Sequence, residues 1–422
     1  MKHKMKKYIA LVVLSLGLFT ACDMVTGEGE GADNAVYMGN SASNGVISVV
    51  VTNEGASAVV TPRLANLADK PVEVTVALDE EMLAAYNAEA GLSMEALAAE
   101  DFVFVTKDSE DAKKTKETHG KAVVTIEPGK YNASVEVRIP KLDETKYPPF
   151  KRLAVPVSVT AASQYKILSS PKSTLIRLNR EIITSVGQFR RGGSIALVPN
   201  EEIRKDPMFN WTMQVSMYYK NMPSRDGNWT VMSIQSGAGN FYTRIERQRG
   251  IQIKNGRDGE ETFTQKSLPN NKWLHITFVH RDASTVSVYV NGELQKTFPT
   301  SPIAFSDAPK CCLYIGNTKY SGVYIREARM WNRALTEGEI IDKEYLPLDP
   351  SAESGLIMYM PFTRVADDKM EELTGNWEIS DFRTLGIWNE DPPAMQYVDN
   401  VKFPSEDLVI IEPENSEEEI RR

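Results

Sequence analysis

The sequence predicts an all-β protein built from two β-sandwiches in series. Short apolar or alternating segments, separated by turn residues, recur along most of the 422-residue chain. One stretch, residues 273–294, reads as two alternating strands closed by an Asn291-Gly292 turn, which supplies the positive φ angles that a two-residue hairpin requires. With 42% hydrophobic residues, a chain of this length can hold two or more cores.

The first residues predict an export signal followed by a lipid anchor. Residues 1–21 begin with lysines, continue as an apolar run and end in small residues, and the run is too short to span a membrane in the mature protein. The ending Thr20-Ala21-Cys22 resembles the bacterial lipoprotein box, which implies that Cys22 is acylated and becomes the new N-terminus. Several acyl chains anchor a protein stably, so we expect membrane contact only through this anchor.

Residues 22–35 form the expected tether. The stretch is rich in glycine and carries four acidic residues, a composition that favours a solvated linker. Acidic residues directly after the lipidated cysteine also resemble the surface-export signal of Bacteroidetes lipoproteins. A plain linker and an export signal are compatible, and together with the anchor they predict an outer-membrane protein that faces the cell exterior.

The charge of the chain argues against two classes of partner. The formal net charge is −9, and loss of the four leader lysines takes the mature chain to −13, which disfavours nucleic acid and anionic membrane surfaces. Cys311 and Cys312 are adjacent in a predicted strand, so they point to opposite faces and make a poor disulfide pair. The four histidines form no cluster with cysteines, so no zinc site is indicated.

Residues 36–180 read as a first sandwich. Regularly spaced strand-like segments suggest antiparallel sheets, and they are GVISVVVTN, PVEVTVAL, FVFVT, KAVVTI, ASVEVRIP, LAVPVSVT and STLIRL. A helical insertion interrupts them, with Asp79 as the expected N-cap, Gly91 as the stop and Ser93 as the N-cap of a second helix. The charged run at residues 107–121 reads as a solvated loop or hairpin.

The strand, helix and Pro-Gly turn of this region carry a resemblance. A strand, then DEEMLAAYNAEAG, then IEPGKYNASVEVRI and the closing LAVPVSVT are similar to the immunoglobulin-like N-terminal domain of unknown function in Bacteroidetes surface lipoproteins. In that family the domain often precedes glycan-handling modules, some of them family 18 endoglycosidases. The resemblance implies a spacer without a catalytic role.

Residues 182–379 read as a second β-rich domain with one short helix. The segments FNWTMQVSMYYK, WTVMSIQSG, FYTRIERQRGIQIKNG and CCLYIGN accompany the hairpin. The helix is expected at 336–343, where Thr336 is a suitable N-cap and the acidic Glu337 and Glu339 suit the positive end of the helix dipole.

The motifs of this second domain resemble the laminin-G-like, concanavalin A-like lectin/glucanase jelly roll. W-x-H-I-T-x-V is followed by V-x-V-Y-V-N-G-E-L, LYIGN and I-R-E-A-R-M-W-N-R-A-L-T-x-x-E-I, and GLIMYMPFTRVADDKMEELTGN is similar to the closing strand. The predicted fold is thus an immunoglobulin-like sandwich with a small helical insertion, then a concanavalin A-like jelly roll. We expect the extension at 380–422 to dock on the jelly roll and to be disordered at its end.

The wet face of the jelly-roll sheet is the predicted carbohydrate site, since this superfamily often holds sugars on its concave face. Alternation points Tyr242 and Arg244 outward from one strand and His275 and Tyr289 outward from the hairpin, so we expect these four side chains to converge. Aromatic rings stack on sugar C–H faces while polar groups bind hydroxyls. An ordinary solvated sheet face is the alternative explanation for any one of these residues.

The rim loops and a calcium ion are further candidates. If another segment fills the concave face, the next ligand-binding candidates are Trp229, Tyr320 and Tyr324. Laminin-G-like domains frequently carry one calcium ion at the rim, so the resemblance leaves calcium open as a ligand. The loop carboxylates show no diagnostic ligand spacing, and surface turns explain them equally well; they are Asp226, Asp258 and Glu260.

The absence of a local catalytic motif favours binding over catalysis. Glucanases of this fold place their catalytic carboxylates along one strand as E-x-D-x-x-E, and no such run occurs here in a β context. We therefore expect a non-catalytic, surface-anchored glycan-binding lipoprotein that serves an outer-membrane glycan-uptake system. A glycoside hydrolase or lyase with a dispersed site and a protein–protein adhesion module remain the alternatives.

Overall fold

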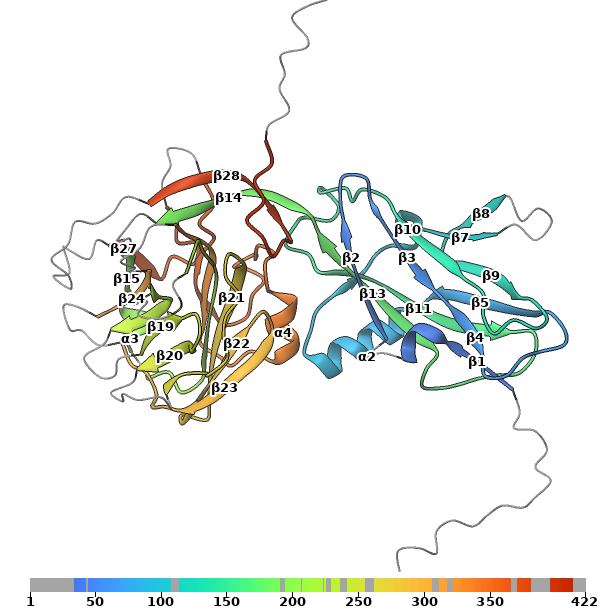
Figure 1. Cartoon of the computed structure of the whole chain (residues 1–422), viewed down its shortest axis with the longest axis horizontal. Coiled ribbons are helices and arrows are strands. Elements are labelled where there is room, and N and C mark those ends of the chain that lie inside the picture. Colours follow the sequence, from blue (N-terminus) through green and yellow to red (C-terminus); the bar gives the residue numbers. More distant parts are fainter. Residues whose placement is uncertain are drawn as a thin grey trace, which may run out of the picture.

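The computed structural model places two β-structured units along the chain, each with its own apolar core (Figure 1). It describes residues 34–42, 45–107, 114–189, 194–205, 207–222, 224, 229–235, 241–254, 262–305, 311–316, 322–365, 370–380 and 395–412. Within these ranges no helix is long and apolar enough to cross a membrane. The predicted leader, Cys22 with its predicted lipidation and most of the predicted tether lie outside them.

The N-terminal unit is a sandwich of short strands, drawn from blue to green in Figure 1. Its strands are β1 (Ala35–Met38), β2 (Val46–Val51), β3 (Ala56–Val60), β4 (Pro62–Leu64), β5 (Val72–Leu78), β6 (Glu95–Ala96), β7 (Val103–Lys107), β8 (Thr115–Thr118), β9 (Lys121–Ile126), β10 (Val135–Ile139), β11 (Leu153–Ala162), β12 (Lys166–Ile167) and β13 (Ser173–Arg180). The largest sheet has the order β2-β13-β11-β5-β9, with β6 beside β11, and the others are β3-β10-β7-β8 and β12-β1-β4.

Strand alternation builds the core of this unit. In β5, Val72, Val74 and Val76 are fully buried and Glu73 is exposed, as expected for a sheet with one wet face. These valines meet the buried residues of β10 and β11 in one cluster. The charged run at 107–121, predicted as a loop or hairpin, contains β8. This strand pairs antiparallel with the preceding strand β7, with Glu117 opposite Val105, as the hairpin alternative requires.

The helical insertion begins and ends where the sequence predicts. In α2 (Glu80–Ala90) the side chain of Asp79 accepts the Met82 N–H, and Gly91 ends the helix in the left-handed region at φ 69°. The predicted second helix after Ser93 is wrong. The Asn87 amide binds both backbone groups of Met94, which holds the chain extended so that β6 pairs with β11. The short 3-10 helices are η1 (Gly39–Ala42) and η2 (Ala99–Asp101).

The C-terminal unit is a two-layered jelly roll, and the all-β prediction is confirmed. Its large sheet has the order β23-β22-β21-β16-β25-β14-β28, with β26 beside β25. The strands of this sheet are β14 (Ile182–Phe189), β16 (Trp211–Tyr219), β21 (Trp273–Arg281), β22 (Thr285–Val290), β23 (Glu293–Pro299), β25 (Val323–Trp331), β26 (Leu356–Met360) and β28 (Met395–Phe403).

The facing layer, named here the small sheet, combines two strand groups, β18-β24-β15-β27 and β17-β19-β20. Its strands are β15 (Ser194–Pro199), β17 (Trp229–Thr230), β18 (Met232–Gln235), β19 (Tyr242–Glu246), β20 (Gly250–Lys254), β24 (Cys312–Gly316) and β27 (Trp377–Ser380). The groups are joined between β18 and β19, where Thr243 N donates to Ser233 Oγ at 2.9 Å and Thr243 Oγ1 donates to the Met232 carbonyl at 2.8 Å.

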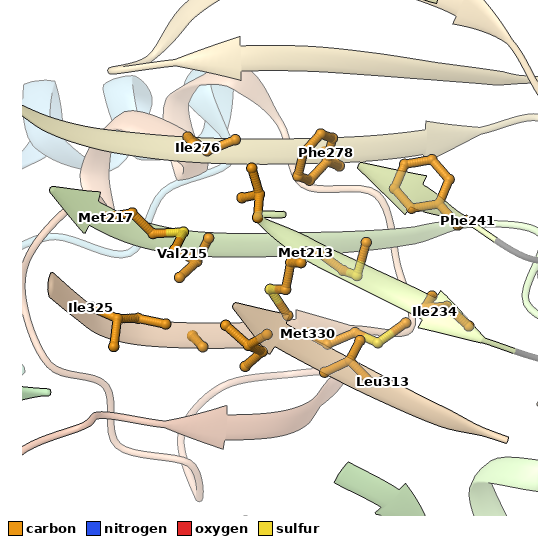
Figure 2. Packing of buried hydrophobic residues seen from close by; sticks show 14 of the residues in the cluster. Met213, Val215, Met217, Ile234, Phe241, Ile276, Phe278, Leu313, Ile325 and Met330 are labelled. Carbon is orange, nitrogen blue, oxygen red and sulfur yellow. The ribbon is translucent and has the colours of Figure 1, made fainter. Parts of the chain in front are cut away.

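The main core lies between the two layers (Figure 2). Met213, Ile276 and Phe278 of the large sheet face Ile234 and Leu313 of the small sheet in one buried cluster. The predicted alternation of the hairpin is therefore confirmed.

The hairpin turn and the cysteine pair also match their predictions. Asn291 and Gly292 take φ angles of 51° and 75°, as a two-residue hairpin turn demands. Cys311 and Cys312 are both buried and belong to clusters on opposite faces of the small sheet.

Two segments cover the outer face of the large sheet, which the sequence predicted to be wet. The first is α4 (Glu337–Asp342), whose N-terminus is a capping box of Thr336 and Glu339. The second is the C-terminal end of β28 with the residues after it. β28 itself is the edge strand beside β14, and its last residue, Phe403, packs on Trp273 with ring centroids 5.0 Å apart. One further short helix, α3 (Glu201–Arg204), lies after β15.

Candidate ligand-binding site

The outer face of the large sheet carries an aromatic row across three neighbouring strands. Tyr218 of β16 pairs with Trp273 of β21 on one side and with Tyr324 of β25 on the other. The Tyr218 ring centroid lies 5.7 Å from that of Trp273 and 5.6 Å from that of Tyr324. Alternation places these rings on the outer face of the sheet, away from the main core, where all three are buried in a cluster with Phe403.

A polar row lies beside the aromatic one. His275 of β21 pairs with Ser216 of β16, which pairs with Arg326 of β25, and His275 Nδ1 lies 2.9 Å from Ser216 Oγ. Burial, helped by the positive charges of Arg329 and Arg326, holds the pKa of His275 well below its usual value. The imidazole is therefore neutral at physiological pH, with one ring nitrogen engaged by Ser216.

A pocket of about 460 Å³ is lined by Trp273 of the aromatic row and by Ser216 and His275 of the polar row. The large sheet, the segment after α4, the end of β13 and the segment after β28 all contribute to its wall. Its aromatic lining consists of Trp273, Tyr345 and Phe403, and its polar lining of Asn179, Ser216, His275, Asn291, Glu344, Ser405 and Glu406. Because Asn179 belongs to the N-terminal unit, both units form this space, and we call it the junction pocket.

Three polar atoms of the junction-pocket residues are buried without a hydrogen-bond partner in the described part of the chain. They are Trp273 Nε1, His275 Nε2 and Tyr345 Oη. Buried polar atoms are nearly always hydrogen-bonded, and each of these three groups keeps an unused donor or acceptor. Burial also raises the pKa of Glu344. The site thus offers aromatic surface together with hydrogen-bonding groups of both kinds.

Tyr242 and Arg244 lie on the other layer, so the predicted convergence of the four residues is wrong. Both point outward from β19 of the small sheet, where Tyr242 packs on Tyr314 and Arg244 binds Gln252. The main core separates them from His275. Alternation identified the outward side of each strand correctly, but two outward side chains in a sandwich can belong to opposite layers. Both remain partly exposed.

The structure buries three further predicted residues. Tyr289 lies under α4 in a cluster with Trp331 and donates from its hydroxyl to Glu337 at 3.3 Å. Trp229 belongs to the main core, 1% exposed, because the strand it opens faces inward there. Tyr324 is the end of the aromatic row. The rings of Tyr289, Trp229 and Tyr324 are therefore not exposed, contrary to the outward and rim positions predicted for them, and Tyr320 lies outside the described residues.

Sequence reasoning missed most of the junction pocket. Trp273 could have been found, since alternation puts it on the same side of β21 as His275. Tyr345 and Phe403 carried no usable signal. Tyr345 lies just beyond α4, and Phe403 is the last residue of β28 in the extension, a segment in which the sequence predicted no strand. In the described ranges no group of three or more His, Cys, Asp or Glu residues could hold a metal ion, and the calcium candidates Asp226, Asp258 and Glu260 lie outside them.

Family models match two parts of the chain. Residues 197–341 match the model of the Concanavalin A-like lectin/glucanases superfamily, of the laminin G type, and residues 32–166 match a model described as an N-terminal domain. Comparison with curated proteins gave no match.

Several solved structures share parts of the architecture. A candidate carbohydrate-binding protein from Bacteroides ovatus is 17% identical with a TM-score of 0.44, over 87% of this chain and 98% of that one. EndoBT-3987 of Bacteroides thetaiotamicron, in complex with Man5GlcNAc product, is 19% identical with a TM-score of 0.25, over 34% and 30% of the chains. A pentraxin from Limulus polyphemus is 10% identical with a TM-score of 0.30, over 46% and 94%.

The TM-scores of these structures are below 0.5, so the similarity supports no conclusion about ligand or activity. The two family matches do agree with the fold described above, because the first falls within the jelly roll and the second within the N-terminal sandwich. The chain carries a laminin-G-type domain of the concanavalin A-like lectin/glucanases superfamily, preceded by an N-terminal domain of a second family.

Proposed function

We propose that this protein binds carbohydrate in the junction pocket. The observation that carries the proposal concerns the residues that line one pocket of about 460 Å³. They combine three aromatic rings with three buried polar atoms that have no hydrogen-bond partner among the described residues. Ligand pockets in proteins typically measure about 300–1,000 Å³ and often lie between domains. The match of the jelly roll to a lectin/glucanase superfamily supports the same ligand class.

The chemistry of the lining suits a sugar. Hydroxyl groups donate and accept hydrogen bonds, and the pocket offers partners for both. Trp273 Nε1 can only donate, the carboxylates of Glu344 and Glu406 accept, and the Tyr345 hydroxyl does either. The rings supply flat apolar faces for sugar C–H groups.

We further propose that Cys22 anchors the protein in the outer membrane, where it presents glycans to an uptake system. The support is the lysine-rich leader, the lipoprotein-like box and the acidic residues after Cys22. An anchored binding protein raises the local concentration of its ligand beside a transporter, which is the advantage expected of such an arrangement.

Removal of one hydroxyl tests the pocket. An array of neutral and acidic oligosaccharides identifies a glycan that the mature chain retains, and calorimetry then gives its affinity. Tyr345→Phe deletes only the unpartnered Oη, and loss of one hydrogen bond costs about 1 kcal/mol, so we expect roughly five- to tenfold weaker binding. Tyr131→Phe is the matched control, since Tyr131 is an exposed tyrosine of the N-terminal unit.

Tyr242→Ala separates the two faces of the jelly roll. If this variant loses affinity while Tyr345→Phe keeps it, the glycan binds on the small sheet and the junction pocket is excluded. If the array retains no glycan with the wild-type chain, carbohydrate binding itself is rejected.

Hydrolysis is the second candidate function, and one observation favours it. Glu344 and Glu406 both line the junction pocket, and burial raises the pKa of Glu344. Glycosidases use a general acid with a raised pKa together with a second carboxylate in the same site. Release of reducing ends from a retained glycan, abolished by Glu344→Gln, would establish an enzyme. Intact glycan after prolonged incubation would exclude hydrolysis and leave binding as the function of the pocket.

A further inference from the structure

The N-terminal unit meets the jelly roll where the ends of two helices abut (Figure 1). Thr336, the N-cap of α4, donates from Oγ1 to the carbonyl of Ala90, the last residue of α2, at 3.3 Å. A Cβ atom at Gly338 would lie 2.8 Å from that carbonyl oxygen, closer than real side chains approach. The contact therefore needs a residue without a side chain in the first turn of α4.

A buried ion pair fixes the same interface. Arg152 Nε of the N-terminal unit lies 3.3 Å from Asp342 Oδ2 at the end of α4, and the two side chains are only 9% and 7% exposed. Burial lowers the pKa of Arg152 and raises that of Asp342. A buried pair contributes little net stability, but a buried charge left without its partner is costly, so the pair selects one docking geometry.

The docked segment leads directly into the junction pocket. Residues 341–346, the end of α4 and the segment after it, lie against Arg152, Arg177 and Asn179 of the N-terminal unit. Glu344 and Tyr345 of that segment and Asn179 itself line the pocket. One wall is therefore supplied by the N-terminal unit, and a second wall is held in place by it.

We propose that the N-terminal unit is an integral part of the binding site, so that its docking on α4 and ligand binding stabilise each other. This differs from the spacer role that the sequence suggested. The effect on ligand binding rests on the proposed carbohydrate binding, whereas the docking of the N-terminal unit on α4 does not. Coupling of this kind is reciprocal, because a ligand that touches both units binds the docked state more tightly than the undocked one.

Gly338→Ala in the full mature chain tests the docking. Alanine is a better helix former than glycine, so the substitution stabilises α4 itself. The new Cβ, however, collides with the Ala90 carbonyl across the interface. We expect a larger radius of gyration by solution X-ray scattering and faster amide exchange in residues 341–346. Glu89→Ala changes an exposed side chain next to Ala90 and serves as the control. A scattering curve and exchange rates equal to those of the wild type would overturn the proposed docking of the N-terminal unit on α4.

The affinity of Gly338→Ala for the glycan retained by the wild-type array tests the coupling. We expect it to fall at least fivefold although the variant changes no residue of the pocket. Normal affinity in an undocked variant would reject the coupling and leave carbohydrate binding intact. If the wild type retains no glycan, carbohydrate binding and its coupling to docking both fail, while scattering and exchange still decide the docking.

Discussion

At the scale of single residues, the outer face of the large sheet shows how burial changes the role of a polar side chain. His275 was expected in water, but it is 3% exposed and is kept neutral by burial and by two arginines. A neutral imidazole in a pocket can bind a hydroxyl, whereas a protonated one would add a positive charge beside Arg326 and Arg329.

Stability should fall as the pH drops below about 6.5, the usual pKa of histidine in an unfolded chain. The pKa of folded His275 is lowered, so between the two values the unfolded state binds more protons and acid favours unfolding. Between pH 7.5 and pH 5.5, His275 should lower the free energy of unfolding by roughly 1 kcal/mol. Urea unfolding at the two pH values measures it.

His275→Gln should remove this share of the pH dependence. The pKa of His280 is also lowered, chiefly by burial, so part of the dependence remains in that variant, and His280→Gln is the comparison. An unchanged pH dependence in His275→Gln would mean that His275 is not buried as a neutral group.

At the scale of elements, α4 contributes to two parts of the molecule. Its inner side packs on Tyr289 and Trp331 of the large sheet, and its N-cap contacts the end of α2. Only six residues long, the helix depends on its cap and on packing, because short helices are marginal by themselves.

Thr336→Ala should destabilise the protein by about 1 kcal/mol, the usual cost of an N-cap. The variant loses the capping bond to Glu339 N at 3.2 Å and the bond to the Ala90 carbonyl. Thr336→Ser keeps the hydroxyl and should stay within a few tenths of a kcal/mol of the wild type. Urea midpoints give both values, and equal losses in the two variants would show that the methyl group, not the cap, matters.

At the scale of the whole molecule, the two units and the C-terminal segment converge on one pocket. The linker between the units is short, since β13 ends at Arg180 and β14 begins at Ile182. β28 then returns along β14 to end with Phe403 in the pocket wall. The chain is therefore organised so that distant parts of the sequence complete one site.

Replacement of Cys22 by alanine should release the protein from the membrane, because acyl chains are its proposed attachment. Fractionation of the producing cells should find the wild type with the outer membrane and Cys22→Ala in the soluble fraction. Protease added to intact cells reports whether the anchored protein faces outward. A variant that stays membrane-bound after washing with salt would reject the lipid anchor.

The sequence by itself determined the local features of this protein. The alternation of Val286 and Val288 against Tyr289, the Asn291-Gly292 turn and the Thr336 cap were all predictable, because each depends on neighbours a few residues apart. Together with the order of the jelly-roll motifs, these features predicted the all-β architecture.

Only the tertiary structure decided which side chains meet. Alternation gives the side of a strand but not the layer to which the strand belongs, so Tyr242 and His275 could be assigned to one face although the core separates them. The contributions of Tyr345 and Phe403 also depended on contacts between segments far apart in the chain. Such contacts follow from which surfaces exclude water together, and no local pattern records them.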